Sequence, residues 1–157
     1  MTKAIRRRPA GDEGFTLIEA VIVVMIIAVV IAIAIPAFRG FSGSAQNRAA
    51  QTGIRAALLS EKAVWLQEEE YTDDPDALVA FEPELVFFEA GIAPHGVVVT
   101  LAEDDDQIVC VEALSASGIM FGVWESATEG TFYGSDRTGA TLGCGAGAPE
   151  GWTQSGW

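Results

Sequence analysis

The sequence predicts an α+β fold, in which a long N-terminal helix packs on a small antiparallel β-sheet. Three observations lead to this class. An apolar run extends from Phe15 to Ile35, a helical pattern of apolar residues follows it, and the remaining chain alternates β-branched or aromatic runs with turn residues. We expect four segments: a basic leader at 1–14, a membrane-spanning assembly helix at 15–38, its amphipathic continuation at 39–70 and an exported β-rich globular domain at 71–157.

The apolar run is about 20 residues long, which suits a helix that crosses a bilayer. Four basic side chains precede it, at Lys3, Arg6, Arg7 and Arg8. The positive-inside rule therefore places the N-terminus in the cytoplasm and the rest of the chain outside. Glu19 lies within the run. A carboxylate at the centre of a membrane helix costs about 2.5 to 3.5 kcal/mol and somewhat less near its end, so Glu19 is expected to be functional.

Cleavage between Gly14 and Phe15 would supply a cation for Glu19. The new α-amino group on Phe15 would lie about one helical turn before the carboxylate. It would be mostly protonated near neutral pH, because its reference pKa is about 7.7 to 8.0. The two charges would then lie at one end of an apolar helix, where they can pair within a chain or between neighbouring chains. The arrangement predicts self-assembly.

The basic leader, Gly14, Phe15, Glu19 and the long apolar helix with Pro36 resemble the N-terminal signal of bacterial type IV pilins and type II secretion pseudopilins. The resemblance covers residues 1–70 and implies a type IV pilin-like fold. It also implies that a prepilin peptidase cuts after Gly14 and N-methylates Phe15, and that Glu19 neutralises the N-terminus of an adjacent subunit. The implied partners are further copies of the chain in a helical fibre, the peptidase, the membrane, and the assembly machinery of a pilus (fimbrium) or of a protein secretion system.

Two other interpretations of the N-terminus remain open. Ala32, Ile33 and Ala34 fit the small-residue pattern of a secretory signal peptide that is cut after Ala34. The apolar run is, however, longer than the 7 to 15 residues of such a peptide's core. A plain single-pass anchor would explain the length and the basic flank, but would leave Gly14 and Glu19 without a role. Within the resemblance, a pilus, a secretion pseudopilus and a competence fibre are alternatives.

The helix is expected to continue past Pro36 with a kink, because proline lacks an amide donor and clashes with the carbonyl four residues before it. From Ala45 to Glu70, apolar residues recur every three or four positions, and this face should pack on the sheet. The pattern consists of Ile54, Leu58, either Glu61 or Lys62, and Trp65, with Ala57 and Val64 beside them. We expect residues 68–70 to form a solvated helix end and residues 71–76 to form a turn.

The following segments are expected to be strands: Leu85–Phe88, Gly96–Ala102, Gln107–Leu114 and Ile119–Glu125. Asp104, Asp105 and Asp106 should form the tight turn of a hairpin. Beyond residues 131–133 the chain is rich in glycine, and both a packed loop and a flexible tail fit it.

The composition indicates an acidic exported product with one disulfide. The net charge of −13 becomes −15 once residues 1–14 and their four basic and two acidic side chains are removed. Such a charge disfavours direct nucleic-acid binding. Cys110 and Cys144 both lie on the exported side, where a pair of cysteines indicates a disulfide, with two reduced thiols as the alternative. A loop of about 35 residues would contribute roughly 4 kcal/mol, and the pair is similar to the disulfide that bounds a C-terminal region in type IV pilins.

No catalytic set is evident, so we expect a structural protein without a cofactor. The single histidine, His95, lies between turn residues and has no nucleophile and acid in a recognised order around it. Asp104, Asp105 and Asp106 are weak candidates for calcium, because the alternating spacing of an EF-hand loop is missing. Among the tryptophans, Trp124 is expected in the core, whereas Trp152 and Trp157 in the tail could instead belong to an adhesive or fibre-packing surface.

Overall fold

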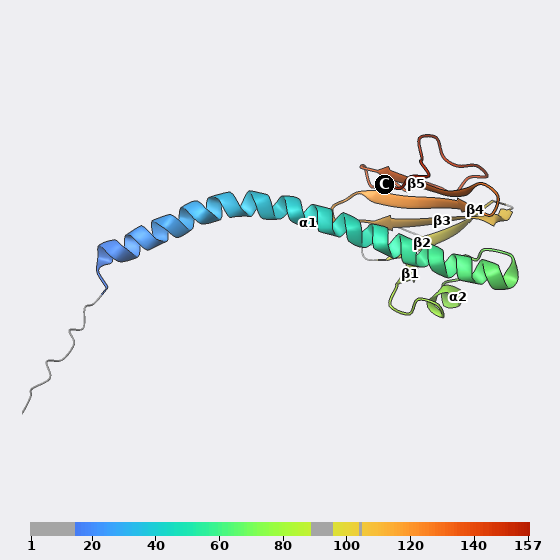
Figure 1. The fold of residues 1–157 in the computed structure, drawn as a ribbon, viewed down its shortest axis with the longest axis horizontal. Coiled ribbons are helices and arrows are strands. Elements are labelled where there is room, and N and C mark those ends of the chain that lie inside the picture. The colour runs from blue at the N-terminus through green and yellow to red at the C-terminus, as the bar shows by residue number, and fades with distance from the viewer. Residues whose placement is uncertain (1–14, 89–95, 104) are drawn as a thin grey trace, which may run out of the picture. The chain divides into compact units, whose positions relative to one another are not determined.

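A computed structural model of the chain describes residues 15–88, 96–103 and 105–157. The chain divides into two compact units, Met1–Gly40 and Phe41–Trp157. The sequence-based bounds of the four segments stay a prediction. The predicted α+β class is confirmed, and Figure 1 shows its elements: α1 (Leu17–Glu68), α2 (Pro75–Val79), β1 (Phe87–Phe88), β2 (Val97–Ala102), β3 (Asp105–Leu114), β4 (Met120–Ser126) and β5 (Gly130–Asp136).

Helix α1 is assigned as one helix through Pro36, and the kink at this proline stays a prediction. The helix ends where Glu69 adopts a positive φ of 62°, a left-handed conformation that commonly terminates helices. Residues 68–70 are all exposed, as expected for a solvated helix end. The second half of α1 lies along one face of the sheet in the unit Phe41–Trp157 (Figure 1).

The short helix α2 lies within and just beyond the segment expected to be a turn. Asp74 is its N-cap, and the Asp74 side chain accepts a hydrogen bond from the Asp76 amide at 3.0 Å. Pro75 follows at the first helical position, where its missing amide hydrogen costs nothing. An aspartate cap followed by proline is a sequence signal for the start of a helix, but the sequence analysis predicted only a turn here.

The sheet has the strand order β1-β2-β3-β4-β5. Strands β2 to β5 form an antiparallel meander, whereas β1 pairs with β2 in parallel, with Phe87 opposite Val97. The sheet is therefore mostly antiparallel, and its parallel edge was not predicted. The predicted hairpin between β2 and β3 is present, but Asp105 and Asp106 belong to β3 rather than to the turn. Asp104 lies outside the described residues.

Strand β5 was missed by the sequence analysis. Its residues include Gly130 and Gly134, and glycine disfavours strands. The strand forms because β4 provides a complete antiparallel partner, from Met120 opposite Asp136 to Ser126 opposite Gly130. Pairing with a long buried neighbour thus outweighs a weak local preference.

Both faces of the sheet are covered, and strand alternation decides which side chain meets which cover. On β3, Val109 and Val111 join the core beneath α1, whereas Ile108 and Cys110 belong to the second core beneath the C-terminal tail. Because both of its faces are covered, β4 is buried along its whole length, including the polar residues Glu125 and Ser126. The core beneath α1 also contains Ile54, Ala57, Leu58 and Val64, so the predicted packing face of the helix is confirmed.

Candidate functional site

The first turn of α1 binds the carboxylate of Glu19. The amide nitrogen of Thr16 lies 2.9 Å from Glu19 Oε2, and the Thr16 hydroxyl oxygen lies 2.6 Å from the same atom. In return, the Glu19 amide donates to the Thr16 hydroxyl at 3.3 Å. This reciprocal pattern is a capping box, which satisfies amide groups that have no partner inside the helix. The sequence analysis missed Thr16, although a threonine three residues before a glutamate is the signature of the motif.

The capping box fixes the Glu19 carboxylate beside the peptide bond that joins Phe15 to Thr16. A carboxylate at this end of a helix is also favoured by the helix dipole. Both hydrogen bonds use Oε2, and among the described residues Glu19 Oε1 accepts none. Gly14 lies outside the described residues, so the structure does not place the expected cleavage point. The geometry leaves one carboxylate oxygen available to a cation near Phe15.

The apolar part of α1 exposes its side chains on every side. From Leu17 to Ile35, the exposed fractions of the large apolar side chains range from 46% to 83%. The helix is long and apolar enough to cross a membrane. A contiguous exposed apolar surface of this kind indicates contact with lipid or with other protein chains.

The disulfide predicted between Cys110 and Cys144 is present and joins β3 to the C-terminal tail, with a Cα–Cα distance of 5.5 Å. It lies in the core beneath the tail, beside Trp124 and Trp152. Trp124 is fully buried, as predicted, and its indole nitrogen donates to the Gly145 carbonyl oxygen at 2.9 Å. The disulfide and this hydrogen bond attach the tail to the sheet at adjacent positions.

The tail is a packed strap that reaches both faces of the sheet. Thr153 exchanges two backbone hydrogen bonds with Tyr133 of β5, at 2.8 and 3.1 Å. Trp152 then lies on the second core, whereas Trp157 packs on the core beneath α1. The Trp157 indole nitrogen donates to the Gly134 carbonyl oxygen at 2.7 Å. Of the two interpretations left open for this region, the packed loop is the one observed.

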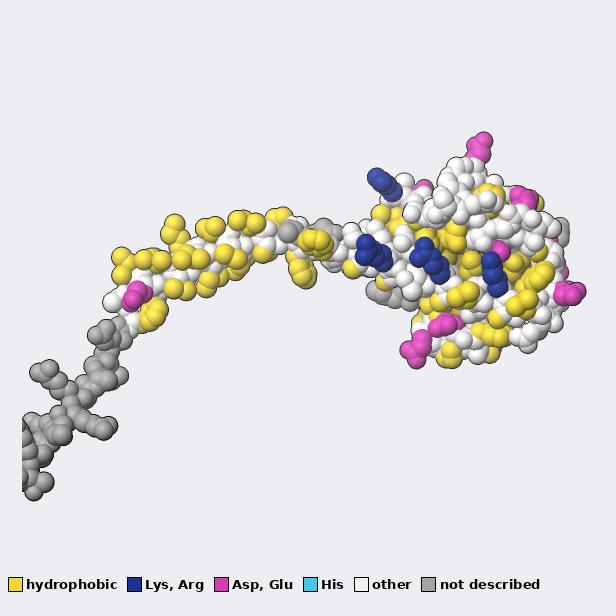
Figure 2. Space-filling view, in the orientation of Figure 1, with side chains coloured by type: hydrophobic (Ala, Val, Ile, Leu, Met, Phe, Trp, Pro, Cys, Tyr) yellow, Lys and Arg dark blue, Asp and Glu magenta, His cyan; other side chains and the backbone are white. Residues whose placement is uncertain are grey.

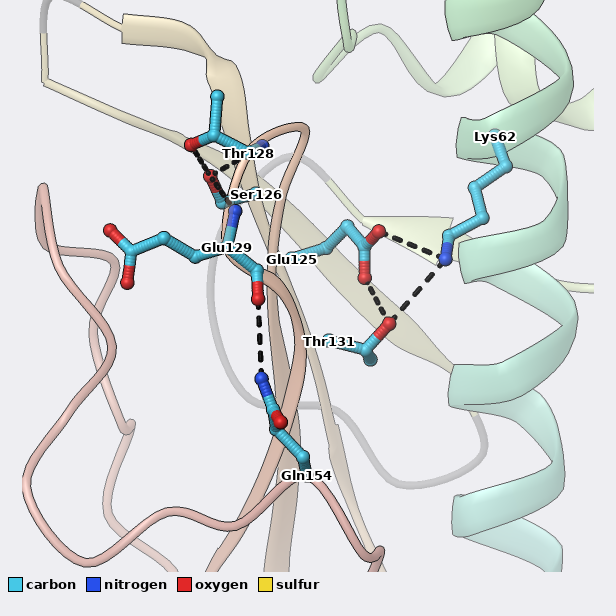
Figure 3. A network of polar contacts seen from close by, with 7 residues as sticks. All are labelled: Lys62, Glu125, Ser126, Thr128, Glu129, Thr131 and Gln154. Carbon is cyan, nitrogen blue, oxygen red and sulfur yellow. Dashed lines mark hydrogen bonds and ion pairs between the residues drawn. The ribbon is translucent and has the colours of Figure 1, made fainter.

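Among the described residues of this unit, three carboxylates are buried, and one of them pairs with a cation from α1 (Figure 3). Glu125 on β4 lies 2.9 Å from the Lys62 ammonium and accepts a hydrogen bond from the Thr131 hydroxyl. The Lys62 nitrogen also reaches the Thr131 hydroxyl oxygen at 3.4 Å. In the same figure, the Gln154 amide nitrogen donates to the Glu129 carbonyl oxygen at 3.2 Å, which connects the tail to the β4–β5 turn. The network connects α1, β4, β5 and the tail.

The second buried carboxylate, Glu61, is less well paired. One of its oxygens accepts the Thr72 amide at 3.2 Å, but the other has no hydrogen bond among the described residues. Burial raises the pKa of Glu61 to about 7. Burial, followed by the charges of Glu125 and Glu61, also raises the pKa of Tyr71 to about 12. The helical pattern allowed either Glu61 or Lys62 on the packing face, and the structure buries the glutamate.

The third buried carboxylate, Glu112, holds the tail. It accepts the Leu142 amide at 2.8 Å, and burial raises its pKa. Strand alternation explains why Glu112 faces the tail while Glu125 faces α1. Glu125 thus fixes α1 to the sheet, and Glu112 fixes the tail to it.

The described residues contain no group of three or more His, Cys, Asp or Glu side chains that could hold a metal ion. Of the weak calcium candidates, Asp105 accepts the Gln107 amide at 3.0 Å and Asp106 accepts the Gln107 side-chain amide at 3.2 Å. Asp104 and His95 lie outside the described residues. The two described aspartates therefore act as local hydrogen-bond acceptors at the start of β3.

Comparison with known proteins supports the N-terminal interpretation. The family model described as the prokaryotic N-terminal methylation motif matches residues 10–35. The type IV major pilin protein PilA of Myxococcus xanthus (strain DK1622) is 37% identical over 73 residues, which make up 46% of this chain and 33% of the relative. The chain thus covers about a third of the relative's length. No solved structure matches the chain. The chain carries the prepilin methylation motif and is similar to a type IV pilin, as the sequence indicated.

Proposed function

We propose that the chain is a prepilin, a structural subunit that a prepilin peptidase cuts after Gly14 and N-methylates at Phe15, and that then polymerises into a pilus through its apolar helix. The observation that carries this proposal is the Glu19 carboxylate, held by Thr16 at the start of α1 beside Phe15. The methylation motif over residues 10–35 supports the processing step. The role is structural rather than catalytic.

The pairing of charges explains how copies of the chain recognise one another. A carboxylate inside a membrane is costly unless it is paired, and Glu19 has one oxygen without a hydrogen bond among the described residues. After cleavage, the Phe15 amine of a neighbouring copy supplies the missing cation. Each copy then carries one anion and one cation at the same helix end, so each addition creates a site for the next.

The proposed location follows from the same features. Before assembly, the chain spans the cytoplasmic membrane once with its N-terminus inside, because the basic residues precede the span. The unit that carries the Cys110–Cys144 disulfide lies outside, where disulfides persist. After assembly, it lies on an extracellular or periplasmic fibre. The partners are other copies of the chain, the peptidase, the assembly machinery and the membrane, without nucleic acid.

A pilus is favoured over a secretion or competence pseudopilus because the relative reported above is a type IV major pilin. A secreted protein that is cut after Ala34 would lose the apolar segment before the cut. A plain single-pass anchor would keep both the leader and the apolar helix. Mass spectrometry of the mature N-terminus distinguishes these cases. A chain that begins at Phe15 with one added methyl group supports the proposal, whereas a chain that begins at Ile35, or that keeps its leader, refutes it.

The Glu19→Val variant tests the pairing itself. It should insert and be cut like the wild type, because the cleavage point and the apolar helix are unchanged. Fibres recovered by shearing should fall roughly tenfold or more, since the Phe15 cation of each incoming copy would be left unpaired in an apolar environment. Glu84→Val, at an exposed glutamate outside α1, is the matched control for processing and fibre yield. Normal fibre yield from Glu19→Val would remove the role assigned to this carboxylate.

A further inference from the structure

The half of α1 that packs on the sheet also has an exposed face on the opposite side of the helix, directed away from the sheet. Its residues are spaced three, four or seven positions apart, so that at 3.6 residues per turn they lie on one side of the helix, opposite the side that carries Ile54, Ala57 and Val64. All of them are exposed, and the exposed fraction is 69% for Leu59 and 77% for Leu66. We call this face the basic stripe: Ala45, Arg48, Thr52, Arg55, Leu59 and Leu66.

The basic stripe concentrates the few cations of a very acidic unit. Phe41–Trp157 contains four basic and nineteen acidic residues. Two of the four, Arg48 and Arg55, belong to the stripe, and Lys62 borders it. Figure 2 shows dark-blue side chains in a row along the helix. Only Arg137 lies elsewhere, beyond β5.

The charges of the stripe are not neutralised within the part of the chain that the structure describes. The ion pair found there uses Lys62 and leaves both arginines without a carboxylate. Arg55 lies over the Trp157 ring, 5.0 Å from its centroid, and this contact with a packed aromatic ring positions the guanidinium at the surface. Arginine is enriched at protein interfaces relative to the rest of the protein surface.

The complementary charge lies at the end of the same helix. Glu68, Glu69, Glu70 and Asp73 are exposed and have no ion pair among the described residues. We call Glu68–Asp73 the acidic turn. It cannot reach the stripe of its own chain, because Arg55 and Glu68 are separated by about 20 Å of rigid helix. A second copy of the chain can bring the two surfaces together.

We propose that the basic stripe of α1 binds the acidic turn of a second copy of this chain. The inference rests on the proposed function and adds to it a contact between the exported units, separate from the pairing at Glu19. The two surfaces differ, so the contact is heterologous. A heterologous contact that does not close into a ring propagates into an open helical filament. Complementary charges mainly select the partner and the register, which suits copies that must add in one orientation.

Charge reversal in the full-length chain, produced together with the peptidase and the assembly machinery, tests this contact. Arg48→Glu with Arg55→Glu should lower the yield of sheared fibres about tenfold, because like charges would face each other. Glu68→Lys with Glu70→Lys should lower the yield similarly. Arg137→Glu is the control for an added negative charge outside the stripe and should assemble like the wild type. Mass spectrometry of the N-terminus and thermal unfolding check that each variant is processed and folded.

The decisive arm combines all four reversals in one chain, which restores complementarity and the original net charge. Its fibre yield should return to within about threefold of the wild type. Wild-type assembly of the Arg48→Glu and Arg55→Glu variant, or a combined variant as defective as its parents, overturns the proposed contact. If the wild-type chain itself starts at Ile35 or forms no fibre, the proposed function fails instead, so the two failures are distinguishable.

Discussion

Glu61 and Thr72 meet at the end of α1, where the Thr72 amide donates to one carboxylate oxygen of Glu61 at 3.2 Å and the other oxygen is buried without a partner among the described residues. The titratable groups around this carboxyl are Tyr71, Asp73, Glu125 and the Lys62 ammonium paired with Glu125. Except for Lys62, these neighbours are acids. The environment therefore favours the neutral form of Glu61.

The pKa of Glu61 predicts that the chain becomes less stable as the pH rises. Burial raises this pKa from 4.5 in the unfolded reference to about 7 in the folded state. Between these values the folded state binds more protons than the unfolded state, so the free energy of unfolding falls by about 3 kcal/mol as the pH increases through this window. Above pH 7 the contribution is constant. Denaturant unfolding of the full-length chain in detergent from pH 5 to pH 8 measures the slope.

Two matched variants assign this slope to Glu61. Glu61→Gln keeps the size and the acceptor for Thr72 but cannot ionise, so its stability at pH 8 should rise by roughly 2 kcal/mol and its slope should flatten. Glu125→Gln should instead destabilise the chain by about 1 to 3 kcal/mol, because Lys62 loses its partner. Destabilisation by Glu61→Gln at pH 8 would contradict the assignment.

The disulfide is predicted to stabilise the C-terminal tail more than it stabilises the sheet. Replacing Cys110 and Cys144 together with alanine should lower the free energy of unfolding by about 2 to 4 kcal/mol, since a closed loop of about 35 residues is opened. Hydrogen exchange should increase most in residues 142–157, because Cys144 anchors the tail beside Trp152. Equal increases in β2, β3 and the tail would show that the bond supports the whole sheet instead.

Gly134 is predicted to be intolerant of even a methyl group. A Cβ at this position would lie 2.2 Å from the Trp152 ring, and the ring is held by the packed tail. Gly134→Ala should therefore cost about 1 to 3 kcal/mol, measured by thermal unfolding and by the change in tryptophan fluorescence. Gly147→Ala is the control, because nothing lies within 4 Å of a Cβ there. Equal stability of the two variants would show that the tail moves aside without cost.

The local sequence pattern was enough to predict the features that are determined by residues close to one another in the sequence. The apolar run, Glu19 with Phe15, the packing face with Ile54 and Leu58, and most strand positions follow from periodicities of three to four or two residues, which are visible in a short window. The pairing of Cys110 with Cys144 was predictable because the sequence contains two cysteines, which allow one pairing. The capping residue Thr16 and the cap of α2 at Asp74 were equally local signals, and the sequence analysis overlooked them.

Contacts between distant segments decided the rest. Sequence periodicity could place either Glu61 or Lys62 against the sheet, and only the position of Glu125 on β4 determined that Lys62 pairs at the border while Glu61 is buried beneath the helix. The glycine-rich tail had no local preference, yet it packs because Gly134 leaves room for Trp152. A short window of sequence contains the spacing of side chains along one element but not the partner across the core, and burial, ion pairing and pKa all depend on that partner.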